Sequence, residues 1–297
     1  ALDGNDGGND YFRGNGYYAK ALDKMDLPEA DRYYLEIQGA NSSADVYLNG
    51  KHLAHHDGGY STWRVDITET LERENLFAIV VNNEANEIVY PQMADFTFYG
   101  GLYRDVNLIC LDESHFDVEF WGSNGIKVTP IVEGKNAKVE FEAFVKNMKE
   151  GQQIRYAVKD AEGKTVAAVT TEDTNVTLEV ADVHLWHGRK DPYMYEATAE
   201  LIEDETVIDN VFAPIGFRTF EIDPERGFIL NGEEYMLRGV SRHQDRITLG
   251  NALTHKEHDE DMAVVKDLGA NTLRLAHYQH DQYFYDLCDE NGIVVWA

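Results

Sequence analysis

Two histidines near the C-terminal end of the sequence stand after apolar segments that have the character of β-strands. His243 follows the segment 235–240, and His277 follows the segment 271–276. Imidazole can donate or accept a hydrogen bond near neutral pH, so each ring is a candidate contact for a polar substrate. A lone histidine in a loop is more often an ordinary polar residue. Two of them at matching strand ends favour a shared site.

Arg274 lies within the second of these apolar segments. A buried guanidinium without a partner would be costly, so Arg274 needs a carboxylate nearby. Two interpretations stay open at this point. The partner is either a carboxylate of the site or an unrelated Asp or Glu in a structural ion pair.

A second group of polar residues, His255, His258, Asp259 and Asp261, has some of the character of a metal cluster. Histidines three residues apart at the start of a helix can share a ligand, but no cysteine or further partner is evident. A polar, solvated first helical turn is the favoured interpretation, and no metal is predicted there.

Alternating strands and helices are predicted around all these candidates. Thr254 and Glu257 form a capping box that opens a helix, which is expected to stop at Gly269. A second helix is expected over 281–291 and a third strand over 293–297. The order β-α-β-α-β predicts a parallel sheet, with both histidines at the carboxyl ends of its strands.

The preceding residues predict two β-modules. The first, 1–112, contains an Asn49-Gly50 turn between two strand-like segments, a strong hairpin signal, and one continuous strand is expected over 102–108. Short strands with such turns are typical of a jelly roll or sandwich. The second module, 113–222, has the pattern of an immunoglobulin-like sandwich without a disulfide. Its strands are expected at 126–132, 138–146, 154–159, 166–171, 175–180, 193–202 and 206–211.

Composition limits the class of function. The 297 residues carry 26 Lys+Arg against 54 Asp+Glu, a formal net charge of −28, which argues against nucleic-acid binding. No apolar run approaches the ~20 residues of a membrane span, so a soluble protein is expected. Cys110 and Cys288 lie far apart, which excludes a disulfide framework and fits a reducing compartment. The first residues are neither a signal peptide nor a start methionine, so the true N-terminus is expected to be missing.

Five motifs, in order along nearly the whole chain, resemble glycoside hydrolase family 2, and most closely its bacterial β-galactosidases. They are FYGGLYRDV at 98–106, LWHGRKDPY at 185–193, GFR at 216–218, LNGEEYMLRGVSRH at 230–243 and NTLRLAHY at 271–278. The resemblance implies a mainly β, multidomain chain. A jelly-roll sugar-binding domain would span 1–112, an immunoglobulin-like β-sandwich 113–222, and the first strands and helices of a (β/α)₈ TIM barrel 223–297.

The resemblance also implies retaining hydrolysis of a β-glycoside, which needs two carboxyl groups about 5 Å apart. In the family these belong to glutamates on barrel strands four and seven. The chain ends with Ala297 in strand three, so the acid/base and nucleophile glutamates are both expected beyond Ala297. No residue of 1–297 is therefore predicted to be catalytic, and this portion is expected to be inactive alone.

Roles for five residues follow from the resemblance. His243 and His277 match positions that contact sugar hydroxyls, and Arg274 matches the arginine that orients the nucleophile and keeps it ionised. Without that nucleophile, Arg274 is expected to be stranded or paired anew. Asp95 matches, by spacing alone, an aspartate that touches substrate and a monovalent cation, although a solvated loop acid is an equal interpretation. Asp245 is a weaker candidate for substrate contact.

The expected activity is therefore that of a β-galactosidase, whose full-length form acts on a terminal β-galactoside or oligosaccharide. No cofactor is required by these residues, while a monovalent or Mg²⁺ cation is compatible with the full-length enzyme. Two alternatives stay open: a β-glucuronidase or β-mannosidase of the same family, and a non-catalytic carbohydrate-binding module. The expected location is the bacterial cytoplasm, with the periplasm or secretion left open. A homo-oligomer is compatible with the family, whereas nucleic acid and membrane partners are not expected.

Overall fold

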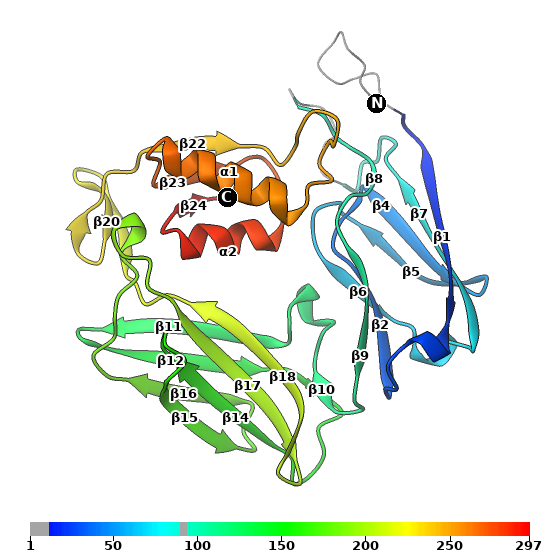
Figure 1. Ribbon diagram of the computed structural model, residues 1–297, viewed down its shortest axis with the longest axis horizontal. Coiled ribbons are helices and arrows are strands. Elements are labelled where there is room, and N and C mark those ends of the chain that lie inside the picture. The colour runs from blue at the N-terminus through cyan, green and yellow to red at the C-terminus, as the bar shows by residue number, and fades with distance from the viewer. Residues whose placement is uncertain (1–11, 90–93, 95) are drawn as a thin grey trace. The chain divides into compact units, whose positions relative to one another are not determined.

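The computed structural model describes residues 12–89, 94 and 96–297, mostly as β-strands, with two α-helices near the C-terminal end (Figure 1). Two compact units divide the chain. One comprises residues 1–111 and 244–254, and the other comprises residues 112–243 and 255–297. Neither described helix is long and apolar enough to cross a membrane.

The first unit is built from two antiparallel sheets, with strand orders β1-β7-β4-β5 and β6-β2-β9, and a short pair β3-β8. Alternate residues of β4 and β7 are buried, because successive side chains of a strand point to opposite faces, and they pack into one core that includes Val46 and Ile79. The strands are β1 (Asn15–Asp23), β2 (Arg32–Ile37), β3 (Ala40–Asn41), β4 (Ser43–Leu48), β5 (Lys51–Asp57), β6 (Trp63–Asp66), β7 (Glu74–Asn82), β8 (Gly101–Leu102) and β9 (Val106–Leu111).

The turn between β4 and β5 lies where the sequence predicts it. Asn49 and Gly50 both have positive φ angles, 54° and 81°, as a two-residue hairpin turn requires. The single strand expected over 102–108 is wrong, because the chain leaves the ladder between β8 and β9. There the Tyr103 hydroxyl donates to the Gly59 carbonyl at 2.6 Å, and Arg104 Nη1 donates to the Tyr60 carbonyl at 2.9 Å.

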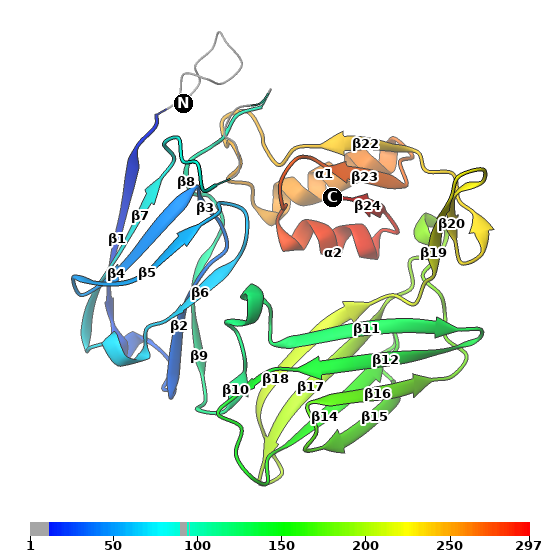
Figure 2. The ribbon, with the colours of Figure 1, turned by 180° about the vertical axis from the view of Figure 1, so that it is seen from behind.

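A sandwich forms the larger part of the second unit, with sheets β11-β12-β16 and β15-β14-β17-β18 (Figure 2). Each of the seven strands expected between 126 and 211 overlaps one of these strands. Phe141, Tyr156 and Phe217 lie in the buried core between the sheets. The strands are β10 (His115–Phe116), β11 (Ile126–Glu133), β12 (Asn136–Ala143), β13 (Val145–Lys146), β14 (Gln153–Lys159), β15 (Thr165–Thr171), β16 (Asn175–Val180), β17 (Tyr195–Glu203) and β18 (Thr206–Ile215).

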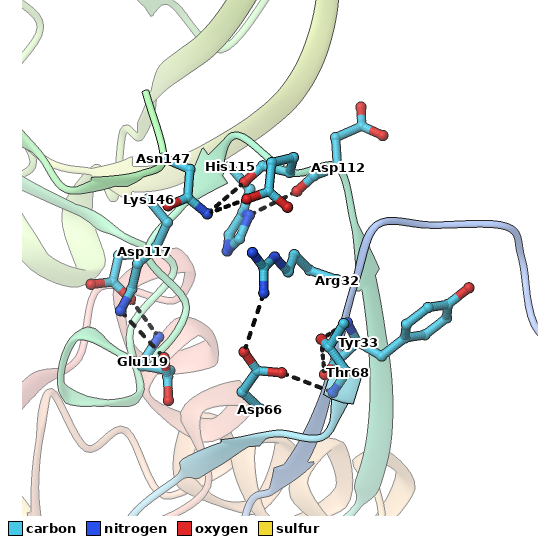
Figure 3. Close-up of polar contacts among 11 residues, drawn as sticks. Arg32, Tyr33, Asp66, Thr68, Asp112, His115, Asp117, Glu119, Lys146 and Asn147 are labelled. Carbon is cyan, nitrogen blue, oxygen red and sulfur yellow. Dashed lines mark hydrogen bonds and ion pairs between the residues drawn. The ribbon is translucent and has the colours of Figure 1, made fainter. Parts of the chain in front are cut away.

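Polar contacts support the short β10–β13 pair at the beginning of this sandwich (Figure 3). Lys146 Nζ lies 3.7 Å from Asp117 Oδ1 and 3.3 Å from Glu119 Oε2. The buried His115 ring donates from Nδ1 to the Asp112 carbonyl at 2.8 Å. These contacts fix the chain where it enters the sandwich.

The C-terminal segment contains a parallel sheet, β22-β23-β24, whose strands alternate with α1 and α2 as the sequence predicts. Both helices pack on the sheet through a core that includes Met262, Leu273 and Phe284 (Figure 1). A small sheet, β19-β20-β21, precedes it. The elements are β19 (Phe220–Asp223), β20 (Gly227–Leu230), β21 (Glu233–Glu234), β22 (Gly239–Arg242), α1 (His255–Asp267), β23 (Thr272–Leu275), α2 (Gln282–Glu290) and β24 (Val294–Trp296).

The first strand of this sheet begins later than the apolar segment 235–240 predicts. Residues 235–238 belong to no strand, and pairing begins where Gly239 lies opposite Thr272. The side chain of Asn271 supplies the hydrogen bonds that a neighbouring strand would make to this segment. Its Oδ1 accepts from Arg238 N at 2.7 Å, and its Nδ2 donates to the Met236 carbonyl at 2.9 Å.

Candidate active site

The two candidate histidines lie side by side at the carboxyl ends of neighbouring parallel strands. His243 directly follows β22, and His277 comes two residues after β23. Their ring centroids are 5.2 Å apart with an interplanar angle of 74°, and the ring of Tyr278 lies 5.9 Å from that of His243. The parallel register produces this proximity, because it pairs Arg242, one residue before His243, with Leu275, two residues before His277.

Arg274 contacts one of these histidines. Its side chain is exposed, and Nη2 lies 3.0 Å from His277 Nδ1. A guanidinium can only donate hydrogen bonds, so Nδ1 of His277 must accept, and the neutral ring then carries its proton on Nε2. Arg274 therefore takes an imidazole as its partner here, rather than a carboxylate.

A groove of about 850 Å³ adjoins this site. Ser241, Arg274 and Trp296 form one row across the three parallel strands and line the groove. Phe228 and Ala297 also contribute to its walls. The aromatic side chains of Phe228 and Trp296 thus line the same groove as Arg274. That the two catalytic glutamates lie beyond Ala297 stays a prediction.

Beneath the site, Arg242 is buried between the sheet and both helices. Its Nε and Nη2 donate to Asp261 Oδ2 at 2.9 and 2.7 Å. Its Nη2 also donates to His258 Nδ1, and its Nη1 to His280 Nδ1, both at 3.0 Å. The guanidinium lies 3.7 Å from the centroid of the Phe284 ring. Burial lowers the pKa of Arg242, and the negative charge of Asp261 opposes that effect.

This arrangement corrects the expectation of a solvated first turn in α1. His258 is buried against Arg242, while the exposed His255 stacks on Tyr283 with a centroid distance of 3.8 Å. Asp259 accepts a hydrogen bond from the Tyr283 hydroxyl at 2.7 Å. Across residues 12–89, 94 and 96–297, no group of three or more His, Cys, Asp or Glu side chains is arranged to hold a metal ion.

Two candidates from the sequence remain, Asp95 and Asp245. Asp95, expected to contact substrate and a cation, lies outside the described residues. Asp245 is exposed and belongs to the stretch 244–254 of the first unit. One unit therefore holds His243, Arg274 and His277 together.

Sequence profiles of one family match three successive parts of the chain. The profile described as "Glycosyl hydrolase 2 galactose-binding domain-like" matches residues 14–96, "Glycosyl hydrolases family 2" matches 124–218, and "Glycosyl hydrolases family 2, TIM barrel domain" matches 221–297. The chain belongs to glycosyl hydrolase family 2. Its parallel sheet with two helices is therefore the beginning of the family's TIM barrel domain.

Individual relatives of this family 2 chain carry two activity names. A β-glucuronidase of Bacteroides fragilis is 38% identical over 303 residues, which cover 97% of this chain and 43% of the relative. A β-galactosidase of Thermoanaerobacter pseudethanolicus is 29% identical, with coverage of 96% and 39%. The crystal structure of an FMN-binding β-glucuronidase from Faecalibacterium prausnitzii L2-6 is 42% identical, with a TM-score of 0.94 and coverage of 98% and 46%. The chain thus spans less than half the length of each.

The sequence of this family 2 chain predicted His243, Arg274 and His277 as site residues, which the structure brings together, but did not point to Arg242 and His280. A signal for Arg242 was present. Arg242 follows an apolar strand-like segment, and an arginine buried in such a place needs buried partners. His280 offered no comparable signal, because only the folded loop brings it to Arg242.

Proposed function

We propose that the whole protein containing this chain is a retaining β-glycosidase. The proposal rests on the grouping of His243, Arg274 and His277 at the carboxyl ends of adjacent barrel strands, the end at which barrel enzymes place their sites. Retaining hydrolysis uses two carboxyl groups about 5 Å apart, one as nucleophile and one as acid and then base. In this proposal both come from parts of the protein beyond Ala297.

The described residues have supporting roles in this reaction. His277 donates from Nε2 to a sugar hydroxyl. His243, whose ring centroid lies 5.2 Å from that of His277, contacts the same substrate. Arg274 also pairs with the nucleophilic carboxylate when that group is present, through N–H donors that its contact with His277 does not use. A nearby positive charge lowers the pKa of a carboxyl group, so Arg274 keeps the nucleophile ionised.

A β-glucuronide is the first candidate substrate. In its favour, the relatives with 38% and 42% identity are named β-glucuronidases. A β-galactoside is the second candidate, since a relative with 29% identity is a β-galactosidase and the sequence motifs resemble that group.

The test is the initial rate of the full-length protein on nitrophenyl β-glucuronide, β-galactoside and β-mannoside. We expect hydrolysis with retention of the anomeric configuration and a preference for the glucuronide. A preference for the galactoside would support the second candidate. No hydrolysis of any of them would contradict the proposal and favour a carbohydrate-binding module. Repeating the assay with EDTA, and with added Mg²⁺ or Na⁺, tests the cation that the resemblance allows.

A further inference from the structure

Arg242 connects the two strand ends that carry the site histidines. Its carbonyl accepts a hydrogen bond from the backbone N–H of Ala276 at 3.0 Å. Its Nη1 donates to His280 Nδ1 at 3.0 Å, and His280 Nε2 lies 3.1 Å from the Ala276 carbonyl. Both backbone polar groups of Ala276 are thus tied to Arg242, one directly and one through His280. Ala276 immediately precedes His277, and Arg242 immediately precedes His243.

The chemistry of these groups allows one protonation state for His280. A guanidinium only donates and a carbonyl only accepts, so Nδ1 of His280 must be an acceptor and Nε2 must carry the proton. The ring is 1% exposed, and water is therefore a poor substitute for either partner. His280 therefore links the guanidinium of Arg242 to the Ala276 carbonyl through two hydrogen bonds, and we call this Arg242–His280–Ala276 connection the relay.

Arg242 is itself immobilised from several directions. Asp261 and His258 bind it from α1, Phe284 contacts the face of its guanidinium from α2, and each side-chain nitrogen has a partner. Ser241 and Arg274 share the row that lines the groove, whereas Arg242 alternates with Ser241 and points toward the helices. Arg242 is therefore placed to hold the site without contacting the substrate.

We propose that Arg242, acting through His280, is a positioning residue that sets the separation of His243 and His277. The inference rests on the proposed function, in which both histidines contact the sugar. Catalytic groups must be held within about 0.5 Å of the productive geometry. A displacement of about 1 Å can lower the rate by ~10²-fold, which gives the relay a measurable effect.

The test compares two substitutions of His280 in the full-length protein. In His280→Gln, the side-chain amide can still accept from Arg242 and donate to the Ala276 carbonyl, whereas His280→Leu can do neither. We expect His280→Leu to lower kcat by ~10²-fold with a smaller change in KM, and His280→Gln to keep kcat within about threefold of the wild type. Wild-type kcat in His280→Leu would overturn the inference, as would an equal loss in both variants.

His258→Leu is the matched control. His258 is equally buried and donates nothing to the relay, but it binds Arg242 through Nδ1 at the same 3.0 Å distance. Its loss should lower Tm about as much as His280→Leu does, with a much smaller fall in kcat. Equal falls in kcat would indicate a structural role for the whole cluster and overturn the relay. If His280→Leu does not fold, Arg242→Lys serves in its place, because an ammonium cannot reach Asp261 and His280 together.

Crystal structures of the variants separate this inference from the proposed function. If the wild type hydrolyses no glycoside, the proposed function fails, and the relay is judged by geometry. The two histidine rings should keep their 5.2 Å separation in His280→Gln and lose it in His280→Leu. An unchanged separation in His280→Leu would overturn the inference.

Discussion

At the scale of single residues, the hydrogen bond between Arg274 and His277 determines what His277 can offer a sugar. Because Nδ1 accepts from Arg274 Nη2 at 3.0 Å, the neutral ring carries its proton on Nε2. His277→Phe keeps a ring of similar shape but removes this donor. We expect kcat/KM of the full-length protein to fall by ~10²-fold, the usual cost of losing one transition-state donor.

The control for that variant is His255→Phe. His255 stacks on Tyr283 at 3.8 Å, a contact that phenylalanine preserves, and it lies outside the site. Its kcat/KM should stay at the wild-type value. Equal losses in the two variants would contradict a role for His277 in substrate binding.

A second residue-scale prediction concerns pH and the acidic cluster on β4 and β5. Asp45 Oδ1 accepts from His52 at 2.8 Å and from His55 at 3.0 Å, and His55 also lies 3.2 Å from Asp57. The hydrogen bond to Asp45 raises the pKa of His55 above 6.5. Burial acts to raise the pKa of Asp45, but hydrogen bonds from His52 and His55 outweigh it, so the pKa lies below 3.8.

The sign of each effect follows from these directions. The contribution of His55 is fully present below its unfolded pKa and is lost as the pH rises through its higher folded pKa. The contribution of Asp45 to the free energy of unfolding is present above its unfolded pKa and is lost as the pH falls through its lower folded pKa.

His55→Ala should therefore lower Tm at pH 5.5 by about 1–2 °C, from about 0.5 kcal/mol for an exposed pair, and have little effect at pH 8.5. Thermal unfolding of residues 1–297 measures this, with Lys51→Ala as the control whose effect should not change with pH. A larger deficit at pH 8.5 would refute it.

At the scale of elements, the loop 185–193 joins the sandwich to the ends of both helices. The indole N–H of Trp186 donates to the Asp289 carbonyl in the last turn of α2 at 2.8 Å. Arg189 donates to the Lys266 carbonyl in the last turn of α1 at 3.4 Å and to the Ala270 carbonyl just beyond that helix at 2.9 Å. Carbonyls at a helix C-terminus lack partners within the helix, and a positive charge is favourable there. The loop thus stabilises α1 and α2 at their carboxyl ends.

Trp186→Phe removes the hydrogen bond to α2 while keeping an aromatic ring. We expect amide hydrogen exchange in α2 and β24 to accelerate about fivefold, which corresponds to a loss of about 1 kcal/mol. Exchange in β12 and β14, in the core of the sandwich, should not change. Trp121→Phe is the control, since Trp121 is 88% exposed, and it should leave all four elements as they are. Faster exchange throughout the sandwich would show that Trp186 supports that core instead.

The elements could be predicted from the sequence wherever local pattern decides them. The seven strands between 126 and 211, the turn at Asn49 and the β-α-β-α-β order are of this kind. The strands predicted over 102–108 and 235–240 were wrong because distant groups bind these segments. The Gly59 carbonyl accepts from the Tyr103 side chain, and the Asn271 side chain binds the backbone of Met236 in place of a neighbouring strand. The same limit applies to the site. Strand ends predict its histidines, but the relay through Arg242 requires groups from several elements to meet.

At the scale of the whole molecule, the chain covers 43% and 46% of two β-glucuronidases that it resembles. The family resemblance predicts that the catalytic glutamates lie on later barrel strands, beyond Ala297. Residues 1–297 should therefore show no turnover on the nitrophenyl glycoside that the full-length protein hydrolyses. Rates are compared at equal molar concentration after removal of host glycosidases. Reproducible turnover by residues 1–297 would show that a carboxylate within them can act as nucleophile.

The same incompleteness predicts where residues 1–297 are least stable. Each sandwich closes a continuous core between two sheets, whereas the three-stranded parallel sheet has β22 and β24 at its edges, each with one partner. Large apolar side chains around it are exposed, Val240 by 42%, Trp296 by 71% and Ile222 by 80%. A completed barrel would cover such surface, and its burial contributes about 25 cal/mol per Å². Limited proteolysis should therefore cut first within 223–297, leave a resistant product that ends near 222, and spare these sites in the full-length protein. Equal resistance along residues 1–297 would contradict this prediction. It would mean that the contacts of Trp186 and Arg189 with the helix ends are enough to protect the three-stranded sheet from proteases.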